Sequence, residues 1–327
     1  MTLQSRVDRI FERPADQGIS LAMVVVHRGS IVAERYGTQP ATDFGPAEDL
    51  GADSTLISWS MAKSITHAAV GLLVADGRID LDARAPVEQW SDSPKADIRI
   101  IDLLEMRPGL EFVEDYVDGE ASNCIAMLFG DGAADHAAYA AALPLVHPPG
   151  TVWNYSSGTT NIIARIVGEI VGGGSEGMER FLAERLFEPC GMSSAVPKFD
   201  EMGTFVGSSF VYASARDFAR FGELYRNDGV TEAGERILPA GWAQHGRTFV
   251  AHDPTDDLEH GFDYGRQWWM WPQYPGSMAA HGYEGQFTVV VPERELTVVH
   301  LGKTDSDVRR HLVRHLDGLI AAVPDTA

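Results

Sequence analysis

The spacing of hydrophobic residues predicts that the chain starts with a short helix and a β-hairpin. Apolar side chains recur at helical intervals over residues 3–11, which predicts a short amphipathic helix. Residues 20–37 then hold two strand-like runs joined by a His-Arg-Gly-Ser turn, the pattern of a β-hairpin. The next helix is expected to begin near Ser60.

Helical patterns dominate from about residue 71 to residue 249. Two of them, at 159–174 and 213–229, close on glycine, as helices often do. Strand-like segments return toward the C-terminus, and a last helix is expected around 306–322. These strand-like segments are 264–271, 286–293 and 295–302.

Strands from both ends of the chain with helices between them predict an α/β fold of the α+β type. One antiparallel sheet, completed by the C-terminal segment and flanked by helices, would lie beside a mostly helical region. No repeat, low-complexity tract or long linker interrupts the chain, so we expect a single catalytic domain over 1–327. Its sheet part would comprise about 1–70 and 250–327, and its helical part about 71–249.

Composition and charge narrow the range of functions. The 327 residues are 44% hydrophobic and 22% charged, which is ordinary for a globular protein. The formal net charge is -21, and only four residues are lysine. Because nucleic-acid binding relies on Lys and Arg to neutralise phosphates, we expect no nucleic-acid partner.

The sequence lacks the usual signs of export or membrane insertion. Its first segment contains no apolar signal region, and no run of about 18 apolar residues occurs anywhere. We therefore expect a soluble, cytoplasmic protein with no membrane partner. Cys124 and Cys190 lie 66 positions apart without metal-ligand spacing, so we expect two buried thiols rather than a disulfide.

Ser60 and Lys63 are the first candidates for chemistry. They stand three residues apart at the start of an apolar segment, so they would share one face of a helix. Ser60 could cap the helix while Lys63 points to water. Alternatively, the two could be a nucleophile and its base. A Ser-x-x-Lys match alone is weak evidence, because about 0.24 matches are expected by chance.

The context of this pair favours the catalytic interpretation. The segment 68–77, which follows Lys63, is apolar enough to be buried. Burial and the positive end of a helix dipole both lower the pKa of an amine, and a neutral amine could take the proton of Ser60. The helix start would also direct backbone N–H groups at a developing oxyanion.

Tyr155 is the third candidate and opens a Tyr-Ser-Ser triplet. Similar triplets begin at Tyr212 and Tyr225, but these lie beside or inside helical patterns, whereas Tyr155 follows a Pro-Pro-Gly turn on an expected loop. A phenol ordinarily has a pKa near 10. It would therefore relay protons near neutral pH only beside a cation such as Lys63.

The motifs around Ser60 and Tyr155 together resemble a known family. The chain is similar to the serine β-lactamase-like superfamily, in particular to the branch of class C β-lactamases, family VIII carboxylesterases and 6-aminohexanoate-dimer hydrolases. The resemblance covers nearly the whole chain, because six segments follow the order and about the spacing of that family. These segments are SMAKS, LLEMRPGLEF, PPGTVWNYSSGTTN, GTFVGSSFVYASARDFARFG, YGRQWWMWP and HGYEGQ.

The resemblance implies a β-lactamase/penicillin-binding-protein-like fold and a role for each of these residues. Ser60 would be the acylated nucleophile, Lys63 its activating amine and Tyr155 the second proton-transfer group. Ser157, in the third position of the tyrosine motif, would hydrogen-bond within the site. Tyr116 is implied as a substrate contact, because its polar loop falls where the dimer hydrolases place a substrate-facing tyrosine.

One element of that family differs in this chain. β-Lactamases carry a Lys-Thr-Gly strand whose lysine binds the substrate carboxylate, whereas the matching stretch here is Ala-His-Gly, with Ala280 in the place of the lysine. His281 and Gly282 would still line the substrate site. The N–H of Tyr283 would join that of Ser60 as the oxyanion hole. This difference favours an esterase or dimer hydrolase over a β-lactamase.

The remaining motifs are expected to be structural. The Lys-Thr-Asp at 303–305 should be a strand-to-helix turn, and the Ser-Asp-Ser at 91–93 a loop that enters a helix. His311 and His315 stand four apart beside Arg309 on the last helix, without a third metal ligand. We therefore expect a solvated basic face there, with no metal and no other cofactor.

The sequence thus predicts a cofactor-free serine hydrolase that forms an acyl-enzyme with a small-molecule ester or amide. It would be a carboxylesterase or an amidase like the 6-aminohexanoate-dimer hydrolases. One alternative is a β-lactamase or D-alanyl-D-alanine carboxypeptidase, against which the missing export signal and the missing lysine at position 280 count. Another is a non-catalytic binding protein on the same fold, against which intact Ser60, Lys63 and Tyr155 count. The pattern predicts no particular oligomeric state.

Overall fold

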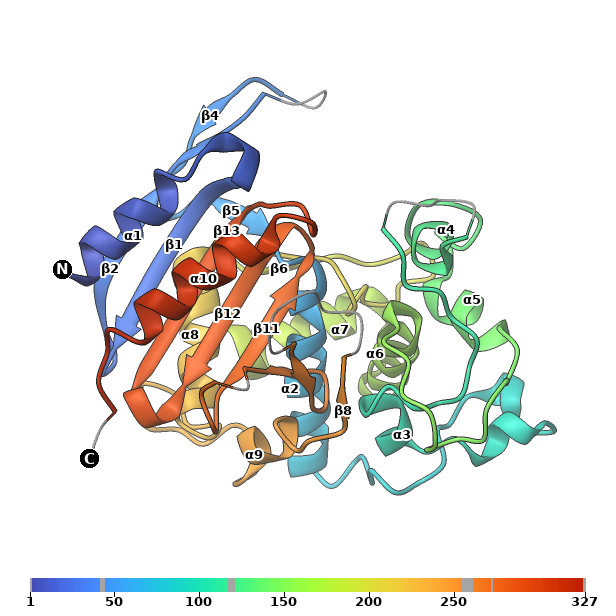
Figure 1. Cartoon of the computed structure of the whole chain (residues 1–327). Helices are drawn as coiled ribbons and strands as arrows, with labels where there is room; N and C mark the ends of the chain where they lie inside the picture. Colours follow the sequence, from blue (N-terminus) through green and yellow to red (C-terminus); the bar gives the residue numbers. More distant parts are fainter. Residues whose placement is uncertain (1, 42–44, 117–120, 254–260, 272, 326–327) are drawn as a thin grey trace.

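The molecule combines a large antiparallel sheet with a group of helices beside it (Figure 1). The structure is a computed structural model. It describes residues 2–41, 45–116, 121–253, 261–271 and 273–325. Within these residues, two segments far apart in the sequence, 19–36 and 251–303, supply all the strands of the large sheet.

The helices are α1 (Leu3–Phe11), α2 (Ala62–Ala75), α3 (Ile100–Leu104), α4 (Asn123–Phe129), α5 (His136–Ala142), α6 (Ser157–Val171), α7 (Gly174–Leu182), α8 (Ala215–Arg226), α9 (Trp242–Gly246) and α10 (Arg309–Ile320). The strands of the large sheet are β1 (Ile19–His27), β2 (Ser30–Tyr36), β8 (Ala251–His252), β9 (Asp263–Tyr264), β10 (Trp269–Met270), β11 (Met278–Gly282), β12 (Gln286–Val291) and β13 (Leu296–Lys303). Their order is β2-β1-β13-β12-β11-β10-β9-β8. Short strands form two further sheets in the described residues, β3 (Thr38–Gln39) with β4 (Glu48–Asp49), and β5 (Thr55–Ile57), β7 (Val211–Ser214) and β6 (Val196–Pro197).

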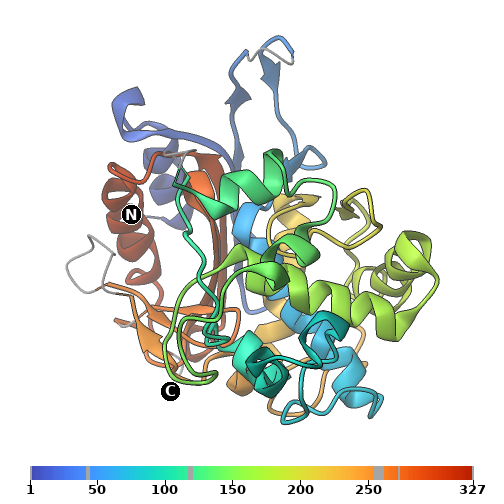
Figure 2. The same cartoon turned by 90° about the vertical axis from the view of Figure 1, so that its right-hand side faces the viewer.

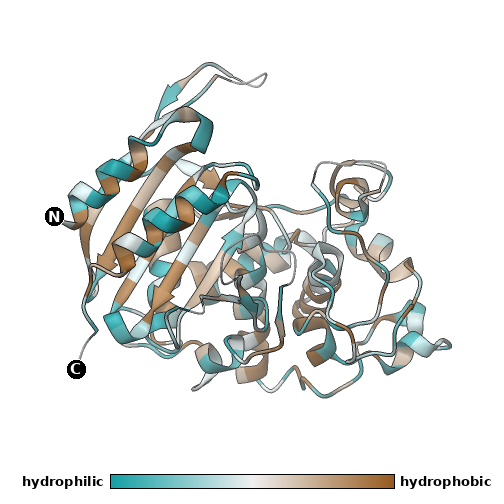
Figure 3. Ribbon diagram, in the orientation of Figure 1, coloured by the Kyte–Doolittle hydropathy of each residue, from teal (hydrophilic) through white to brown (hydrophobic). Residues whose placement is uncertain are grey.

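Both faces of the sheet are covered. Met23 and Val25 of β1 belong to one hydrophobic cluster with residues of α1 and α10, whereas Val24 and Val26 belong to another with residues of α2 and α8. Side chains of a strand alternate between faces, so β1 needs apolar residues at successive positions. Figure 3 shows this as hydrophobic colour along the central strands, beneath the mixed surfaces of α1 and α10.

The fold class and most of the predicted elements are confirmed. The expected first helix, the hairpin and the helix after Tyr155 correspond to α1, β1 with β2, and α6. The strand expected over 264–271 is interrupted, because Gln267 has a positive φ of 61° and separates β9 from β10. The division of the chain into sheet and helical parts of one domain stays a prediction.

The segment before Ser60 is held by the small sheet. β5 pairs with β7, and Ser58 then continues this contact, because its N–H donates to Val211 O at 2.8 Å and its Oγ accepts from Val211 N at 3.1 Å. α2 follows, and it contacts both β11 and α6. Figure 2 shows α2, in light blue, between the sheet and the green helices of residues 123–171. Ser60 therefore lies where the two parts of the fold meet.

Several smaller predictions can also be compared with the structure. Cys124 is buried and Cys190 half-buried, and both are free thiols. Lys303 ends β13 and the next helix starts at Arg309, which confirms the strand-to-helix turn. Ser93 caps the short turn that follows it by accepting from Lys95 N. None of the described helices combines the length and the apolar character needed to cross a bilayer.

Candidate active site

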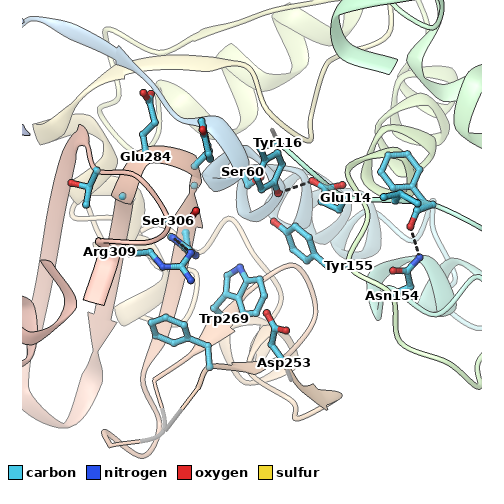
Figure 4. A pocket seen from close by; sticks show the side chains of 18 of the residues that line it. Ser60, Glu114, Tyr116, Asn154, Tyr155, Asp253, Trp269, Glu284, Ser306 and Arg309 are labelled. Carbon is cyan, nitrogen blue, oxygen red and sulfur yellow. Dashed lines mark hydrogen bonds between the residues drawn. The ribbon is translucent and has the colours of Figure 1, made fainter. Parts of the chain in front are cut away.

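A cavity of about 460 Å³ opens between the sheet and the helical region (Figure 4). Its floor contains Ser60, and the end of β11 forms one wall. Of the residues proposed from the sequence, those that line it are Ser60, Tyr116, Tyr155, His281, Gly282 and Tyr283. Lys63 and Ser157 lie beneath this surface, since their exposed fractions are 2% and 1%. The fold thus brings all of the proposed site residues to one place.

Lys63 contacts Ser60 directly. Its Nζ lies within hydrogen-bond distance of Ser60 Oγ at 2.9 Å, Ser157 Oγ at 2.9 Å and the Ser208 carbonyl at 3.1 Å. Burial lowers the pKa of Lys63, and the nearby Glu114 carboxylate opposes that effect. The interpretation of Lys63 as a solvated surface residue is therefore wrong. An amine in this setting can take a proton from the serine hydroxyl.

The cap interpretation of Ser60 is wrong as well. α2 begins at Ala62, and Ser60 lies in the preceding 3-10 turn Trp59–Met61 without capping the helix. Trp59, immediately before it, has a positive φ of 43°. A bulky residue in this region costs on the order of 1–3 kcal/mol, and such strain is concentrated at functional sites.

A second residue with a positive φ, Glu284, is hydrogen-bonded to Trp59. Glu284 has a φ of 60°, and its Oε2 accepts a hydrogen bond from Trp59 Nε1 at 3.2 Å. Trp59 directly precedes Ser60 and Glu284 directly follows Tyr283. This bond therefore ties together the two backbone segments whose N–H groups were proposed as the oxyanion hole.

Gly282 allows these two segments to approach. A Cβ atom at Gly282 would lie 3.1 Å from Ser60 N and would overlap the Ser58 carbonyl. Only glycine therefore fits at this end of β11. The next residue, Tyr283, begins a 3-10 turn directly after this close approach to the Ser60 amide.

Tyr155 lies beside Ser60 in the lining of the larger cavity. Its ring centroid lies 4.9 Å from Lys63 Nζ and 5.2 Å from the ring of Trp269. Burial raises the pKa of Tyr155 and Glu114 raises it further, whereas a hydrogen bond with Ser60 opposes them. The sequence suggested that the neighbouring Lys63 would lower the pKa of this phenol. In the structure, burial instead keeps the phenol un-ionised near neutral pH. Tyr155 is a neutral hydroxyl that can donate a proton.

The other two tyrosine triplets lie away from the cavity. Tyr225 is buried, and its hydroxyl bonds His67 Nδ1 at 2.7 Å. The Tyr212 ring lies 5.6 Å from Lys198 Nζ. Neither tyrosine lines the cavity that contains Ser60.

Glu114 is a residue that sequence analysis missed. Its carboxylate accepts from Ser157 N at 2.7 Å, from Ser157 Oγ at 2.5 Å and from the Tyr116 hydroxyl at 2.8 Å. The last of these bonds is drawn in Figure 4. The only signal in the sequence was an acidic residue two positions before Tyr116. Residues 117–120, the second half of that loop, lie outside the described residues.

His281 faces Arg309, which the sequence predicted to lie on a solvated basic face of the last helix. The Arg309 Nη1 lies 3.5 Å from His281 Nε2, and Arg309 lines the cavity. Burial and then Arg309 lower the pKa of His281 well below its ordinary value, so the ring is neutral and accepts. The first turn of α10 therefore supplies the cavity with a positive charge that Ala280 does not.

A smaller apolar cavity of about 80 Å³ lies on the α4 side of Ser60. Tyr116 and Ser60 belong to both cavities, whereas Tyr155 lines only the larger one. The α4 residues that enclose the smaller cavity are Cys124, Ile125, Leu128 and Phe129. This slot can hold a short hydrocarbon group beside the serine hydroxyl.

An accessible serine bonded to a buried lysine, next to a neutral tyrosine in a cavity, defines a serine hydrolase. In the described residues no cluster of three His, Cys, Asp or Glu side chains suits a metal ion. The sequence matches the Beta-lactamase family over residues 7–322. The protein therefore belongs to the Beta-lactamase family, which confirms the resemblance drawn from its motifs.

Individual relatives agree with this assignment. A 6-aminohexanoate-dimer hydrolase of Paenarthrobacter ureafaciens is 24% identical over 321 residues, 92% of this chain and 76% of that protein. A solved structure from Bacillus anthracis, proposed to be a 6-aminohexanoate-dimer hydrolase, has a TM-score of 0.75 at 24% identity and covers 95% of this chain and 82% of its own. A family VIII carboxylesterase has a TM-score of 0.72 at 16% identity and covers 98% of both chains. These structures have the same fold as this chain.

Proposed function

We propose that this protein hydrolyses small esters or amides through an acyl-enzyme formed on Ser60. The observation that carries the proposal is the 2.9 Å contact between Ser60 Oγ and the buried Nζ of Lys63. A non-catalytic binding protein would have no need for an amine whose pKa is lowered beside a serine hydroxyl. The carboxylesterase and dimer-hydrolase names among the relatives support the same substrate classes.

The acylation step follows from these contacts. Lys63 takes the proton from Ser60 Oγ as that oxygen bonds to the substrate carbonyl carbon. The negative charge that develops on the carbonyl oxygen is stabilised by the N–H groups of Ser60 and Tyr283. When the bond to the leaving group breaks, Tyr155 donates its proton to the departing oxygen or nitrogen and regains one from the Lys63 ammonium.

Deacylation uses the same groups in reverse. A water molecule enters where the leaving group was and attacks the acyl carbon, giving its proton to the Tyr155 oxygen while the Tyr155 hydroxyl passes its own proton to the neutral amine of Lys63. Ser60 Oγ regains its proton from the Lys63 ammonium as the acid product leaves. The oxyanion again lies between the N–H groups of Ser60 and Tyr283.

The two cavities suggest how the substrate is oriented. The leaving group must reach the Tyr155 hydroxyl, and Tyr155 lines only the 460 Å³ cavity. The acyl chain would then occupy the 80 Å³ apolar slot beside α4. This orientation favours short apolar acyl chains and tolerates a larger, more polar leaving group.

Covalent labelling tests the proposal. A fluorophosphonate is expected to add one label per chain, because it reacts with activated serines. Intact-protein mass spectrometry and peptide mapping should place the label on Ser60, and Ser60→Ala should stay unlabelled. Labelling of Ser60→Ala at the wild-type rate would contradict the assignment of the nucleophile.

A substrate panel tests the proposed orientation. We expect p-nitrophenyl acetate and butyrate to be hydrolysed with a kcat/KM at least about 10-fold above that of the octanoate, because a longer acyl chain exceeds the volume of the small apolar slot. The series should be measured at pH 7 to 8 on one preparation, with Ser60→Ala as the blank. A kcat/KM that keeps rising to octanoate would contradict the assignment of the α4 slot to the acyl chain.

A β-lactamase or D-alanyl-D-alanine carboxypeptidase is the second candidate, and one observation favours it. Arg309 places a cation beside His281 at the cavity wall, where a substrate carboxylate could bind. Asp253 and Glu284 line the same cavity and disfavour an anion. Including a chromogenic cephalosporin in the panel separates the candidates, since hydrolysis as fast as that of the acetate ester would favour the second.

A further inference from the structure

The Glu114 carboxylate controls which way the Ser157 hydroxyl points. Ser157 N donates to Oε2 at 2.7 Å and Ser157 Oγ donates to Oε1 at 2.5 Å, so both polar groups of this residue face one carboxylate. The Tyr116 hydroxyl adds a third donor to Oε1 at 2.8 Å. A hydroxyl has one hydrogen, so the Ser157 oxygen can offer Lys63 only lone pairs.

This arrangement determines how Lys63 can use its own hydrogens. A neutral amine carries two N–H groups and one lone pair. Ser157 Oγ, at 2.9 Å, and the Ser208 carbonyl, at 3.1 Å, are both acceptors and take the two N–H groups. The remaining lone pair then faces the third neighbour, Ser60 Oγ, at 2.9 Å.

We propose that Glu114 is a positioning residue that acts through Ser157 to aim the lone pair of Lys63 at the Ser60 hydroxyl. The inference rests on the proposed function, because it concerns the base of that reaction. Glu114 need not touch the reacting atoms for this purpose. Its effect depends on the direction of one hydrogen, that of the Ser157 hydroxyl, which lies between Glu114 and Lys63.

Replacing Glu114 by glutamine should turn the hydrogen of the Ser157 hydroxyl away from residue 114 and toward Lys63. The backbone N–H of Ser157 still needs an acceptor, so the glutamine oxygen takes the place of Oε2 and its NH₂ group takes the place of Oε1. That NH₂ would donate to Ser157 Oγ, and the Ser157 hydrogen would turn toward Lys63. The lone pair of Lys63 would then bind Ser157 rather than Ser60.

We expect Glu114→Gln to lower kcat for p-nitrophenyl butyrate by about 10- to 100-fold, with KM changed by less than about 3-fold. The decisive measurement is a double-mutant cycle with Ser157→Ala. Once the Ser157 hydroxyl is gone, adding Glu114→Gln should change kcat by less than about 2-fold, because coupled residues are not additive.

Asp217→Asn is a matched control. Asp217 likewise accepts from both the N–H and the Oγ of one serine, Ser194, at 2.7 and 2.6 Å, but it lines neither cavity at Ser60. It should alter kcat by less than about 2-fold, even if thermal unfolding shows a lower midpoint. If Glu114→Gln does not fold, Glu114→Asp replaces it in the cycle, since it keeps the charge and shortens the reach to Ser157.

The pH profile gives a second readout. The titratable groups around Lys63 are Glu114, Cys124 and Tyr155. The Glu114 charge raises the pKa of Lys63, so its removal lowers that pKa. The base is active when neutral, and the acid limb of kcat/KM should therefore move to lower pH in Glu114→Gln while the plateau falls. Glu114→Asp should lower the plateau with little movement of this limb.

Two results would overturn the inference. One is wild-type kcat in Glu114→Gln. The other is an equal loss with and without the Ser157 hydroxyl, which would mean that Glu114 acts by another route. Neither result affects the proposed function, which instead fails if Ser60→Ala hydrolyses the ester as fast as the wild type.

Discussion

Lys63→Met is expected to lower kcat/KM for p-nitrophenyl butyrate by on the order of 10⁴-fold, about as much as Ser60→Ala. The amine is the only base in contact with the Ser60 hydroxyl among the hydrogen bonds of the described residues. Members of one catalytic unit are not additive, so Ser60→Ala combined with Lys63→Met should be no slower than either variant alone.

Methionine keeps most of the volume of this side chain, whose exposed fraction is 2%. The midpoint of thermal unfolding should be equal to that of the wild type or higher, because an amine that must be desolvated is replaced by an apolar group. Lys198→Met, at an exposed lysine, is the control and should keep wild-type activity. Turnover near the wild-type rate in a folded Lys63→Met protein would refute the role of Lys63 as base.

Tyr155→Phe is expected to lower kcat by about 10²- to 10³-fold for an ethyl ester and by clearly less for a p-nitrophenyl ester. Burial raises the pKa of Tyr155, so it acts as a neutral proton donor to the leaving group. An ethoxide needs that proton far more than a nitrophenolate does. The comparison of the two esters therefore separates loss of proton donation from general disruption of the site.

The ring contacts of Tyr155 are retained in this variant. Trp269 and Tyr264 pack on the ring at centroid distances of 5.2 and 5.6 Å, whereas the hydrogen bonds of the hydroxyl with Ser60 and Trp269 are lost. Tyr212→Phe removes the same atom from a triplet away from the cavity and should change neither ester's kcat. An equal loss for both esters in Tyr155→Phe would contradict its role as proton donor to the leaving group.

The predictions that held were mostly local in sequence. The apolar spacing over 3–11 and the turn at 27–30 are properties of neighbouring residues, and they gave α1 and the β1–β2 hairpin. Ser60 and Lys63 are three residues apart, so one helical turn brings them together in almost any tertiary setting. The predicted strand over 264–271 failed at Gln267, whose positive φ depends on its surroundings.

Sequence by itself determined the class of fold, the order of its elements and the three residues of the proposed catalytic unit. Only the tertiary structure decided the protonation and direction of those groups. The carboxylate of Glu114 acts on Ser157 from 43 positions away, and Arg309 reaches His281 from 28 positions away. Such contacts depend on burial and on the approach of separate elements, and no local pattern of residue types encodes these distances.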